Sequence, residues 1–407
     1  MQLTRRSLLT HSSALGCSLA ASPLLTPVTF AAAPWDTRLV VIILRGGMDA
    51  LDAVQPYGDP DYAGLRQSLR GGPAAGAADL DGFYALHPGL APLLPLWRGR
   101  ELAFVQAVST PYRGRRSHFD GQDLLEAGTA GLRQAEGGWL NRLLQQMPGA
   151  EARTAFAIGQ ERMLLTEGGA PVSQWAPGAG LMMSPQAERL AALLMEDDPL
   201  FHAALNEALE LTRQDMDLEA AQGGGEAGNE DMMMSMMTAP KGKVHNEVAA
   251  YAAQQLRGDT RIAAFSINGW DTHSRQAYGL KNALGRLSET ILTLQNGLGP
   301  DVWSKTAVAA VTEFGRTVRE NGTGGTDHGT GGAMLLAGGA IRGGRVLGRW
   351  PGLAEADLYD RRDLMPTADV RRSLAWLLHG LTGVGKGGLE ANVFPGLEMG
   401  SDLGLLL

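Results

Sequence analysis

The chain of 407 residues contains a single cysteine, Cys17, close to its N-terminus. Without a second cysteine, no disulfide can form within the chain, and a metal site built from several thiolates is excluded. If the segment that carries Cys17 is removed after synthesis, the remaining protein has no cysteine nucleophile either. Lipid attachment at Cys17 is an alternative, although Ala14 lies where a lipoprotein cleavage site usually has leucine.

The sequence also lacks an excess of basic residues and a long hydrophobic run. It has 35 Lys and Arg against 43 Asp and Glu, a formal net charge of −8, which excludes the basic footprint of a nucleic-acid-binding protein. The apolar stretch near the N-terminus is interrupted by His11, Pro23 and Pro27, and it falls short of the ~20 apolar residues that a membrane span needs. We therefore expect neither a nucleic-acid partner nor a stable transmembrane anchor.

Residues 1–33 have the layout of an export signal. Arg5 and Arg6 precede the interrupted apolar stretch, and a run of alanines ends it before Pro34. The paired arginines resemble a twin-arginine signal, which implies export of the folded protein by the twin-arginine machinery. We expect cleavage near Ala33 and a periplasmic or secreted protein, in which the loss of two arginines takes the net charge from −8 to −10.

Six apolar runs rich in β-branched residues predict buried strands. Between them lie segments with helical spacing, such as 280–298, which is followed by Gly299. Continuous rather than alternating apolar character is typical of parallel strands that are covered on both faces. We expect residues 34–407 to form a single α/β domain, a three-layer sandwich with a mostly parallel central sheet. The predicted strands are 38–44, 102–108, 154–159, 261–267, 306–312 and 333–339.

Residues 222–243 interrupt this pattern with glycines, acidic residues and methionines. A mobile Gly/Met-rich surface loop is the simpler interpretation. The alternative is a site for a soft metal or a hydrophobic partner, because the thioethers of the methionines between 232 and 237 would suit Cu(I).

Four of the predicted strands are followed by segments rich in acidic, histidine, serine or arginine side chains. Ligands in open α/β sheets bind at the carboxyl ends of strands, so these segments should meet. Asp49 fits a helix N-cap and a metal ligand equally well. Asp271 and His273 in "WDTH" would face the same way on an extended segment, and Asp327 and His328 form a second Asp-His pair. These ligand types favour a divalent metal site, and the glycines around the second pair would leave access for the ion.

Ser117 lies where "SHFDGQDLLEAG" predicts the start of a helix. It can act as the N-cap, or as a nucleophile, since a helix N-terminus favours a bound phosphate or sulfate. Arg113, Arg115 and Arg116 precede it and would add affinity for an anion. His118 follows it as a candidate acid or base, or as a surface residue of the helix.

Five motifs, "GGMD", "RSHFDGQD", "GWDTH", "TEFGRT" and "DHG", occur in this order behind the paired arginines. Together they resemble the secreted bacterial family known as domain of unknown function 1501, and more broadly the alkaline phosphatase superfamily, which includes phosphatases and sulfatases. The resemblance spans residues 38–384 and implies an alkaline phosphatase-like fold with a serine nucleophile, Ser117. It also implies two divalent ions, one held by Asp49, Asp327 and His328, the other by Asp271 and His273.

In that superfamily the second ion usually has another histidine downstream of "DHG". The only one here is His379, in an amphipathic segment that favours a structural role, so Glu313 is the alternative ligand. The ligand types do not distinguish Zn, Mn, Mg or Ca. We expect an exported hydrolase of small phosphate or sulfate esters, with Arg116 or Arg316 contacting the anion. The missing histidine keeps open a non-catalytic binding or assembly protein with the same fold and at most one metal.

Overall fold

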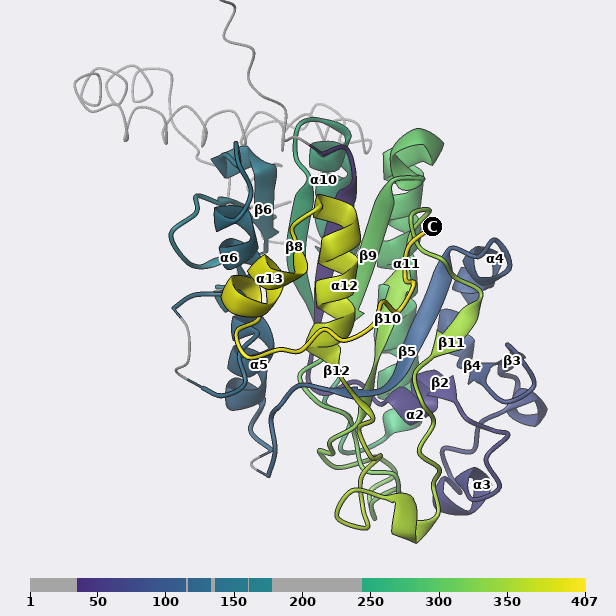
Figure 1. Cartoon of the computed structure of the whole chain (residues 1–407). Helices are drawn as coiled ribbons and strands as arrows, with labels where there is room; N and C mark the ends of the chain where they lie inside the picture. Colours follow the sequence, from purple (N-terminus) through teal and green to yellow (C-terminus); the bar gives the residue numbers. More distant parts are fainter. Residues whose placement is uncertain (1–34, 115, 133–135, 160, 178–243) are drawn as a thin grey trace, which may run out of the picture.

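The computed structural model describes residues 35–114, 116–132, 136–159, 161–177 and 244–407 (Figure 1). The predicted export signal with Cys17, the arginine at position 115 and the Gly/Met-rich segment 222–243 lie outside these residues. Within the described ranges, no helix is both long and apolar enough to cross a membrane.

All six predicted strands are confirmed, and each begins and ends within two residues of its predicted bounds. In the described residues they belong to one sheet of nine strands, in the order β11-β5-β10-β9-β1-β8-β6-β7, with β12 paired to β5. The strands are β1 (Arg38–Arg45), β5 (Leu102–Ser109), β6 (Ala155–Ile158), β7 (Ser173–Trp175), β8 (Ile262–Asn268), β9 (Thr306–Val311), β10 (Gly332–Ala337), β11 (Arg345–Leu347) and β12 (Ala368–Asp369).

The sheet is mostly parallel, as predicted. β1 pairs in parallel with β8 and β9, and β6 continues the parallel arrangement. The exception is β10, which runs antiparallel to both β9 and β5. Because of this reversal, the segment just before β10 lies at the same edge of the sheet as the carboxyl ends of β1, β5, β8 and β9. The "DHG" motif therefore meets motifs that follow other strands.

Helices cover both faces of the sheet and complete the expected three-layer sandwich (Figure 1). Alternate side chains of β1 point into two separate hydrophobic cores, because successive residues of a strand face opposite sides. Val40, Ile42 and Leu44 pack with α10 (Val244–Arg257) and α11 (Gln276–Trp303). Leu39, Val41 and Ile43 pack with α6 (Trp139–Gln145) and α12 (Val370–Thr382).

The predicted helix 280–298 lies within α11, which begins earlier, at Gln276. Helical geometry is interrupted at Gly299, whose φ is 70°, where the sequence predicted the helix to end. A small sheet, in the order β2-β4-β3, lies beside the main one. The remaining α-helices and strands of the described residues are α2 (Ala50–Ala53), β2 (Val54–Gln55), α3 (Tyr62–Leu65), β3 (Ala78–Asp79), β4 (Ala85–Leu86), α4 (Leu94–Arg98), α5 (His118–Ala127) and α13 (Lys386–Gly388).

Candidate metal centre

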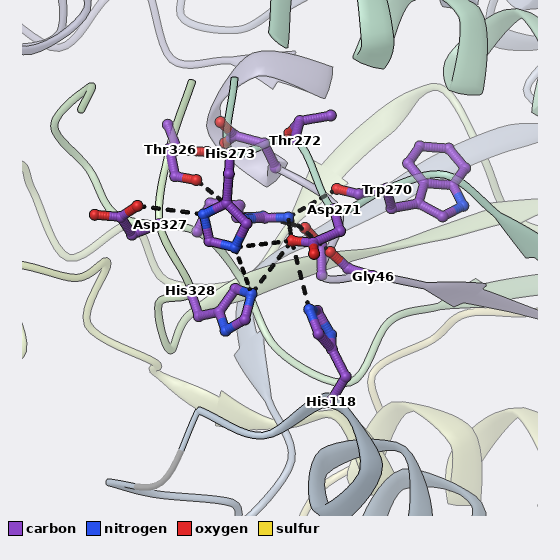
Figure 2. Close-up of polar contacts among 12 residues, drawn as sticks. Gly46, His118, Trp270, Asp271, Thr272, His273, Thr326, Asp327 and His328 are labelled. Carbon is purple, nitrogen blue, oxygen red and sulfur yellow. Dashed lines mark hydrogen bonds and ion pairs between the residues drawn. The ribbon is translucent and has the colours of Figure 1, made fainter. Parts of the chain in front are cut away.

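The candidate site lies at the edge of the sheet where four strands end and β10 begins. His118 is the first residue of α5, which follows β5. Asp271 and His273 lie between β8 and α11, and Asp327 and His328 lie between β9 and β10. Segments far apart in the sequence thus bring their ligand-type side chains together, as the strand ends indicated (Figure 2).

Three histidine side chains converge on one oxygen of Asp271. The distance from Nε2 to Asp271 Oδ1 is 3.1 Å for His273, 3.2 Å for His328 and 3.4 Å for His118. The Nε2 atoms of His273 and His328 are 2.9 Å apart. The rings of His118 and His328 meet edge to face, with centroids 4.2 Å apart. The four side chains form one compact cluster, the His-Asp cluster (Figure 2).

The other ring nitrogen of each histidine contacts an oxygen that can only accept a hydrogen bond. Nδ1 of His118 lies 2.7 Å from Glu313 Oε1, and Nδ1 of His273 lies 3.3 Å from Asp327 Oδ1. Nδ1 of His328 lies 2.9 Å from the carbonyl oxygen of Arg116. In a neutral imidazole with this contact, Nδ1 carries the proton and donates it, and Nε2 is left with a free lone pair.

The Nε2 lone pairs that converge on the carboxylate oxygen repel one another, and a bound cation would offset this repulsion further than the Arg316 guanidinium alone. Nε2 of His118 is buried and has no hydrogen-bond partner among the described residues. Ligand atoms of His118, Asp271 and His328 all lie within 4.8 Å of one another, which suits three groups that bind one ion. Imidazole nitrogens and a carboxylate oxygen are ligands of divalent transition metals. The residues present therefore fit a metal ion.

Glu313 lies behind His118 rather than in the cluster. Its side chain is wholly buried, and Oε1 accepts hydrogen bonds from Gly46 N at 2.9 Å and from Gln122 Nε2 at 3.3 Å as well as from His118. Burial alone would raise the pKa of Glu313, but these donors lower it below its ordinary value, so the group is ionised. Such a carboxylate does not bind the metal itself but orients a histidine that does.

The pKa values of His118 and His328 are displaced in opposite directions. The hydrogen bond from Glu313 raises the pKa of His118 above its ordinary value, against the opposing effect of burial. Burial lowers the pKa of His328, and the nearby positive charges of His118 and Arg316 act in the same direction. The lowered pKa of His328 favours the neutral imidazole, the form that binds a metal, whereas the raised pKa of His118 makes metal binding there compete with a proton.

Arg316 has a different place from the one expected of an anion contact. Its side chain is fully buried, and its nitrogens donate to the carbonyl oxygens of Gly46, Gly47, Trp270 and Thr326 at 2.8–3.0 Å. Nη2 also lies 2.5 Å from Asp271 Oδ1. This ion pair lowers the pKa of Asp271, although burial opposes it. Arg316 therefore ties three loops together and fixes the carboxylate on which the histidines converge.

Asp49 is the N-cap of α2 and lies outside the cluster. Its Oδ1 accepts from Leu51 N at 3.1 Å, and Oδ2 accepts from Arg66 Nη1 at 2.6 Å and from Gln276 Nε2 at 2.6 Å. Both Asp49 and Arg66 are almost wholly buried. The capping role predicted for Asp49 is confirmed. Its predicted role as a metal ligand stays a prediction, and its oxygens are already engaged.

The expected grouping of ligands in two ion sites differs from the arrangement found. Asp271 and His273 join His328 and His118 in one cluster. Asp327 lies on the outer side of His273, where its carboxylate also accepts from Asn321 Nδ2 at 3.1 Å. That hydrogen bond lowers the pKa of Asp327. His379 lies in α12, with Nδ1 2.8 Å from the carbonyl oxygen of Val384, as expected of a structural histidine.

Ser117 and Arg116 lie at the start of α5. Ser117 is the N-cap, and its hydroxyl accepts from Asp120 N over a long 3.4 Å. The backbone N–H of Ser117 donates to the hydroxyl of Tyr112 at 2.8 Å. Arg116 has a positive φ of 58° and an exposed side chain, and its carbonyl oxygen is the partner of His328. This left-handed turn brings the entry of α5 against the His-Asp cluster.

The glycines around "TDHG" have a packing role that the sequence alone did not reveal. A Cβ on Gly325 would collide with the backbone of Thr272 and His273, and one on Gly329 would collide with the backbone of Arg316. These glycines allow the two ligand-bearing loops to approach each other closely. Access for an ion, which the sequence suggested, is therefore not their only use.

Among solved structures, the chain is similar to several bacterial proteins at low identity. A protein in the alkaline phosphatase superfamily from Vibrio parahaemolyticus is 12% identical, with a TM-score of 0.34, and the match covers 75% of this chain and 61% of that one. The lipoteichoic acid synthase LtaP from Listeria monocytogenes is 8% identical, with a TM-score of 0.38 and coverage of 90% and 77%. Alkaline phosphatase from the Antarctic bacterium TAB5 is 10% identical, with a TM-score of 0.32 and coverage of 75% and 91%.

No curated protein sequence matches the chain. A family model, described as "Protein of unknown function (DUF1501)", matches residues 108–386. This region is well over half of the chain, and it includes His118, Asp271, His273 and His328. The chain therefore belongs to the DUF1501 family.

Proposed function

We propose that this protein is an exported, metal-dependent hydrolase of phosphate or sulfate esters, with the His-Asp cluster as its metal site. The observation that carries the proposal is the convergence of three imidazole Nε2 atoms on Asp271 Oδ1, at 3.1–3.4 Å. All three Nδ1 atoms are engaged with acceptors, so the cluster presents lone pairs where a cation would bind.

The donor set favours a transition metal such as Zn²⁺. Nitrogen ligands outnumber oxygen ligands in the cluster, whereas Mg²⁺ and Ca²⁺ are held almost entirely by oxygen atoms. His273 is 44% exposed and His118 is 23% exposed, so the cluster is open to solvent on one side. An open position beside the protein ligands is typical of a catalytic rather than a purely structural zinc site.

A divalent ion at this position would polarise the ester and offset the negative charge that develops during its cleavage. Ser117, next to His118, is the proposed nucleophile. Its hydroxyl oxygen would form a bond to phosphorus or sulfur as the bond to the leaving alcohol breaks, and the serine proton would pass to the departing alkoxide. Water would then cleave the bond between the serine oxygen and phosphorus or sulfur, which releases the anion and restores the hydroxyl. The N-terminus of α5 carries the positive end of the helix dipole, which favours that anion, and exposed Arg116 provides positive charge at the rim. Glu313 and Arg316 would hold His118 and Asp271 in place.

The test is a screen of phosphate and sulfate esters with the zinc-loaded parent, Ser117→Ala, His118→Ala and the surface control Gly322→Ala. We expect both active-site variants to lose activity by about 100-fold or more, while Gly322→Ala, which has open space around it, retains it. If activity depends on His118 but not on Ser117, the proposed metal site is supported and the serine is not the nucleophile. Activity unchanged in both variants would contradict the proposal.

A non-catalytic binding protein is the second candidate, and one observation favours it. The hydroxyl of Ser117 already caps α5, so the residue has a sufficient structural reason to be serine. This candidate predicts a stoichiometric metal complex that hydrolyses none of the esters in the screen. It also predicts that Ser117→Ala lowers the free energy of unfolding by about 1 kcal/mol and leaves metal affinity unchanged.

Export through the twin-arginine machinery completes the proposal and rests on the sequence of residues 1–33. Replacing both Arg5 and Arg6 by lysine keeps the charge but removes the paired arginines. We expect the parent in the periplasmic or secreted fraction and the double variant in the cytoplasm. If the double variant is exported at the parent's level, the twin-arginine route is contradicted. That result would have no bearing on the proposed metal site.

A further inference from the structure

Gln276, the first residue of α11, has a side-chain amide that is completely buried and fully hydrogen-bonded. Its Oε1 accepts from the hydroxyls of Thr272 at 2.9 Å and Thr326 at 2.6 Å. Its Nε2 donates to Asp49 at 2.6 Å and to Asp52 at 3.1 Å. Hydroxyl donors on one side and carboxylates on the other fix the orientation of the amide.

The two threonines belong to the two loops that carry the candidate ligands. Thr272 stands between Asp271 and His273, and Thr326 directly precedes Asp327 and His328. The loops also touch through two backbone hydrogen bonds: the N–H of Thr326 donates to the carbonyl oxygen of Thr272 at 3.2 Å, and the N–H of Arg275 donates to that of Thr323 at 3.3 Å. Like Arg316 and Asn321, the side chain of Gln276 therefore connects the "WDTH" segment to the "TDHG" segment. Gln276 also connects both segments to the buried pair of aspartates behind them.

We propose that Gln276 is a positioning residue for the metal centre. Together with Arg316 and Asn321, it sets the separation of the two ligand-bearing loops. This inference rests on the proposed metal site. His273 and His328 come from different loops, yet their Nε2 atoms lie 2.9 Å apart. A ligand set divided in this way binds an ion tightly only if both loops are already held at the right distance. The main chain of Gln276 contributes as well, because its N–H donates to the carbonyl oxygen of Gly324 at 2.9 Å.

Two substitutions separate the functions of the amide. Gln276→Met keeps the length and burial of the side chain but leaves the hydroxyls of Thr272 and Thr326 without their acceptor. Gln276→Glu offers an acceptor to the threonines but sets a third carboxylate against Asp49 and Asp52. Gln276→Met should loosen the two loops together, whereas Gln276→Glu should keep the two threonine hydroxyls bound and break the link to Asp49 and Asp52.

The matched control is Asn141→Leu. Asn141 is another wholly buried amide, on α6, and it also makes four side-chain hydrogen bonds: Nδ2 donates to the carbonyl oxygens of Thr166 and Ala170, and Oδ1 accepts from Ala170 N and Gln145 Nε2. Its loss should destabilise the fold without disturbing the ligand-bearing loops. A merely structural role for Gln276 would make its variants behave like this control.

The experiment measures zinc affinity by competition with a chelating dye, and hydrogen exchange of the metal-free protein across both loops. We expect Gln276→Met to bind Zn²⁺ about 10- to 100-fold more weakly than the parent and to exchange faster in residues 271–273 and 326–328 together. Asn141→Leu should match the parent in both measurements. If Gln276→Met does not fold, Thr272→Val and Thr326→Val each remove one hydroxyl and should show smaller losses of affinity.

If Gln276→Met binds zinc and exchanges hydrogen as the parent does, the inference is overturned and the proposed function still stands. The same holds if both threonine variants behave like the parent. A parent that binds no zinc would contradict the proposed function. In that case, faster exchange of both loops in Gln276→Met would still show that this residue couples them, and unchanged exchange would show that it does not.

Discussion

Each histidine of the His-Asp cluster is oriented by the atom that its Nδ1 contacts. Glu313, Asp327 and the carbonyl oxygen of Arg116 are all acceptors, so they select the same tautomer in three different rings. The pairing of His118 with Glu313 joins residues that are 195 positions apart. The sequence pointed to both residues but did not pair them: His118 was a candidate acid or base, and Glu313 was a possible metal ligand. Which nitrogen faces which partner is decided by loop conformation, which the motifs do not encode.

Glu313→Gln tests this orientation directly. The amide is similar in size but removes the negative charge that holds the Nδ1 proton of His118, so we expect metal affinity to fall by about 10- to 100-fold. Isothermal titration with Zn²⁺ measures the change. Glu101→Gln is the control, because Glu101 accepts from Trp303 Nε1 at 3.0 Å at the opposite end of β5. An affinity equal to the parent's in Glu313→Gln would show that the carboxylate does not support the site.

Asp49→Asn tests whether Asp49 acts through Arg66 or through a metal. The substitution leaves Arg66 buried without its counter-charge, and breaking such a pair costs roughly 3–5 kcal/mol of unfolding free energy. Chemical denaturation measures this loss, and we expect zinc affinity to remain near the parent's. If zinc affinity falls as far as in His328→Ala while stability is retained, Asp49 is a ligand.

The same pair gives the parent a defined acid sensitivity. Burial would raise the pKa of Asp49, but Arg66 holds it below the ordinary value of 3.8. Because the folded pKa is lower than the unfolded one, the stabilisation is complete above pH 3.8 and is lost as the pH falls through the folded pKa. The stability difference between parent and Asp49→Asn should therefore shrink as the pH falls below 3.8. A constant difference would contradict the ion pair.

At the scale of elements, the strands of the sheet determine where the residues of the His-Asp cluster lie. The long buried strands were predictable because strands covered on both faces are continuous apolar runs. The convergence of the segments that follow these strands was also predictable, because ligands in open α/β sheets bind at the carboxyl ends of strands. The reversal of β10 was not predictable from its composition, since antiparallel and parallel buried strands have the same apolar character. Arg66 lies in a loop-rich insertion, so its burial against Asp49 was also not visible in the sequence.

Close approach of the two ligand-bearing loops predicts a contrast between two neighbouring glycines. Gly325→Ala would force Cβ into the backbone of Thr272 and His273, whereas the Cβ of Gly322→Ala meets no atom of the described residues within 4 Å. We expect the first substitution to weaken zinc binding and lower the melting temperature, and the second to do neither. Equal behaviour of the two variants in the same titration and thermal melt would argue against tight loop packing.

For the whole molecule, metal binding should be coupled to folding. The cluster draws its side chains from segments after β5 and β8 and before β10, so it exists only when the sheet is assembled. An ion that binds only the folded chain adds about 2.7 kcal/mol of stability at about 100 times its Kd. We therefore expect a chelator to lower the melting temperature of the zinc-loaded parent and to leave that of His328→Ala unchanged. A parent that melts at the same temperature with and without chelator would oppose this coupling.

The most direct test of the central claim, that the His-Asp cluster is a metal site, is metal content by elemental mass spectrometry. The protein would be exported and purified without chelator, beside His118→Ala, Asp271→Asn and the control Asn141→Leu. The account predicts a stoichiometric transition metal in the parent and in Asn141→Leu, and its loss from the two cluster variants. A metal-free parent, or equal metal content in all four proteins, would contradict the account.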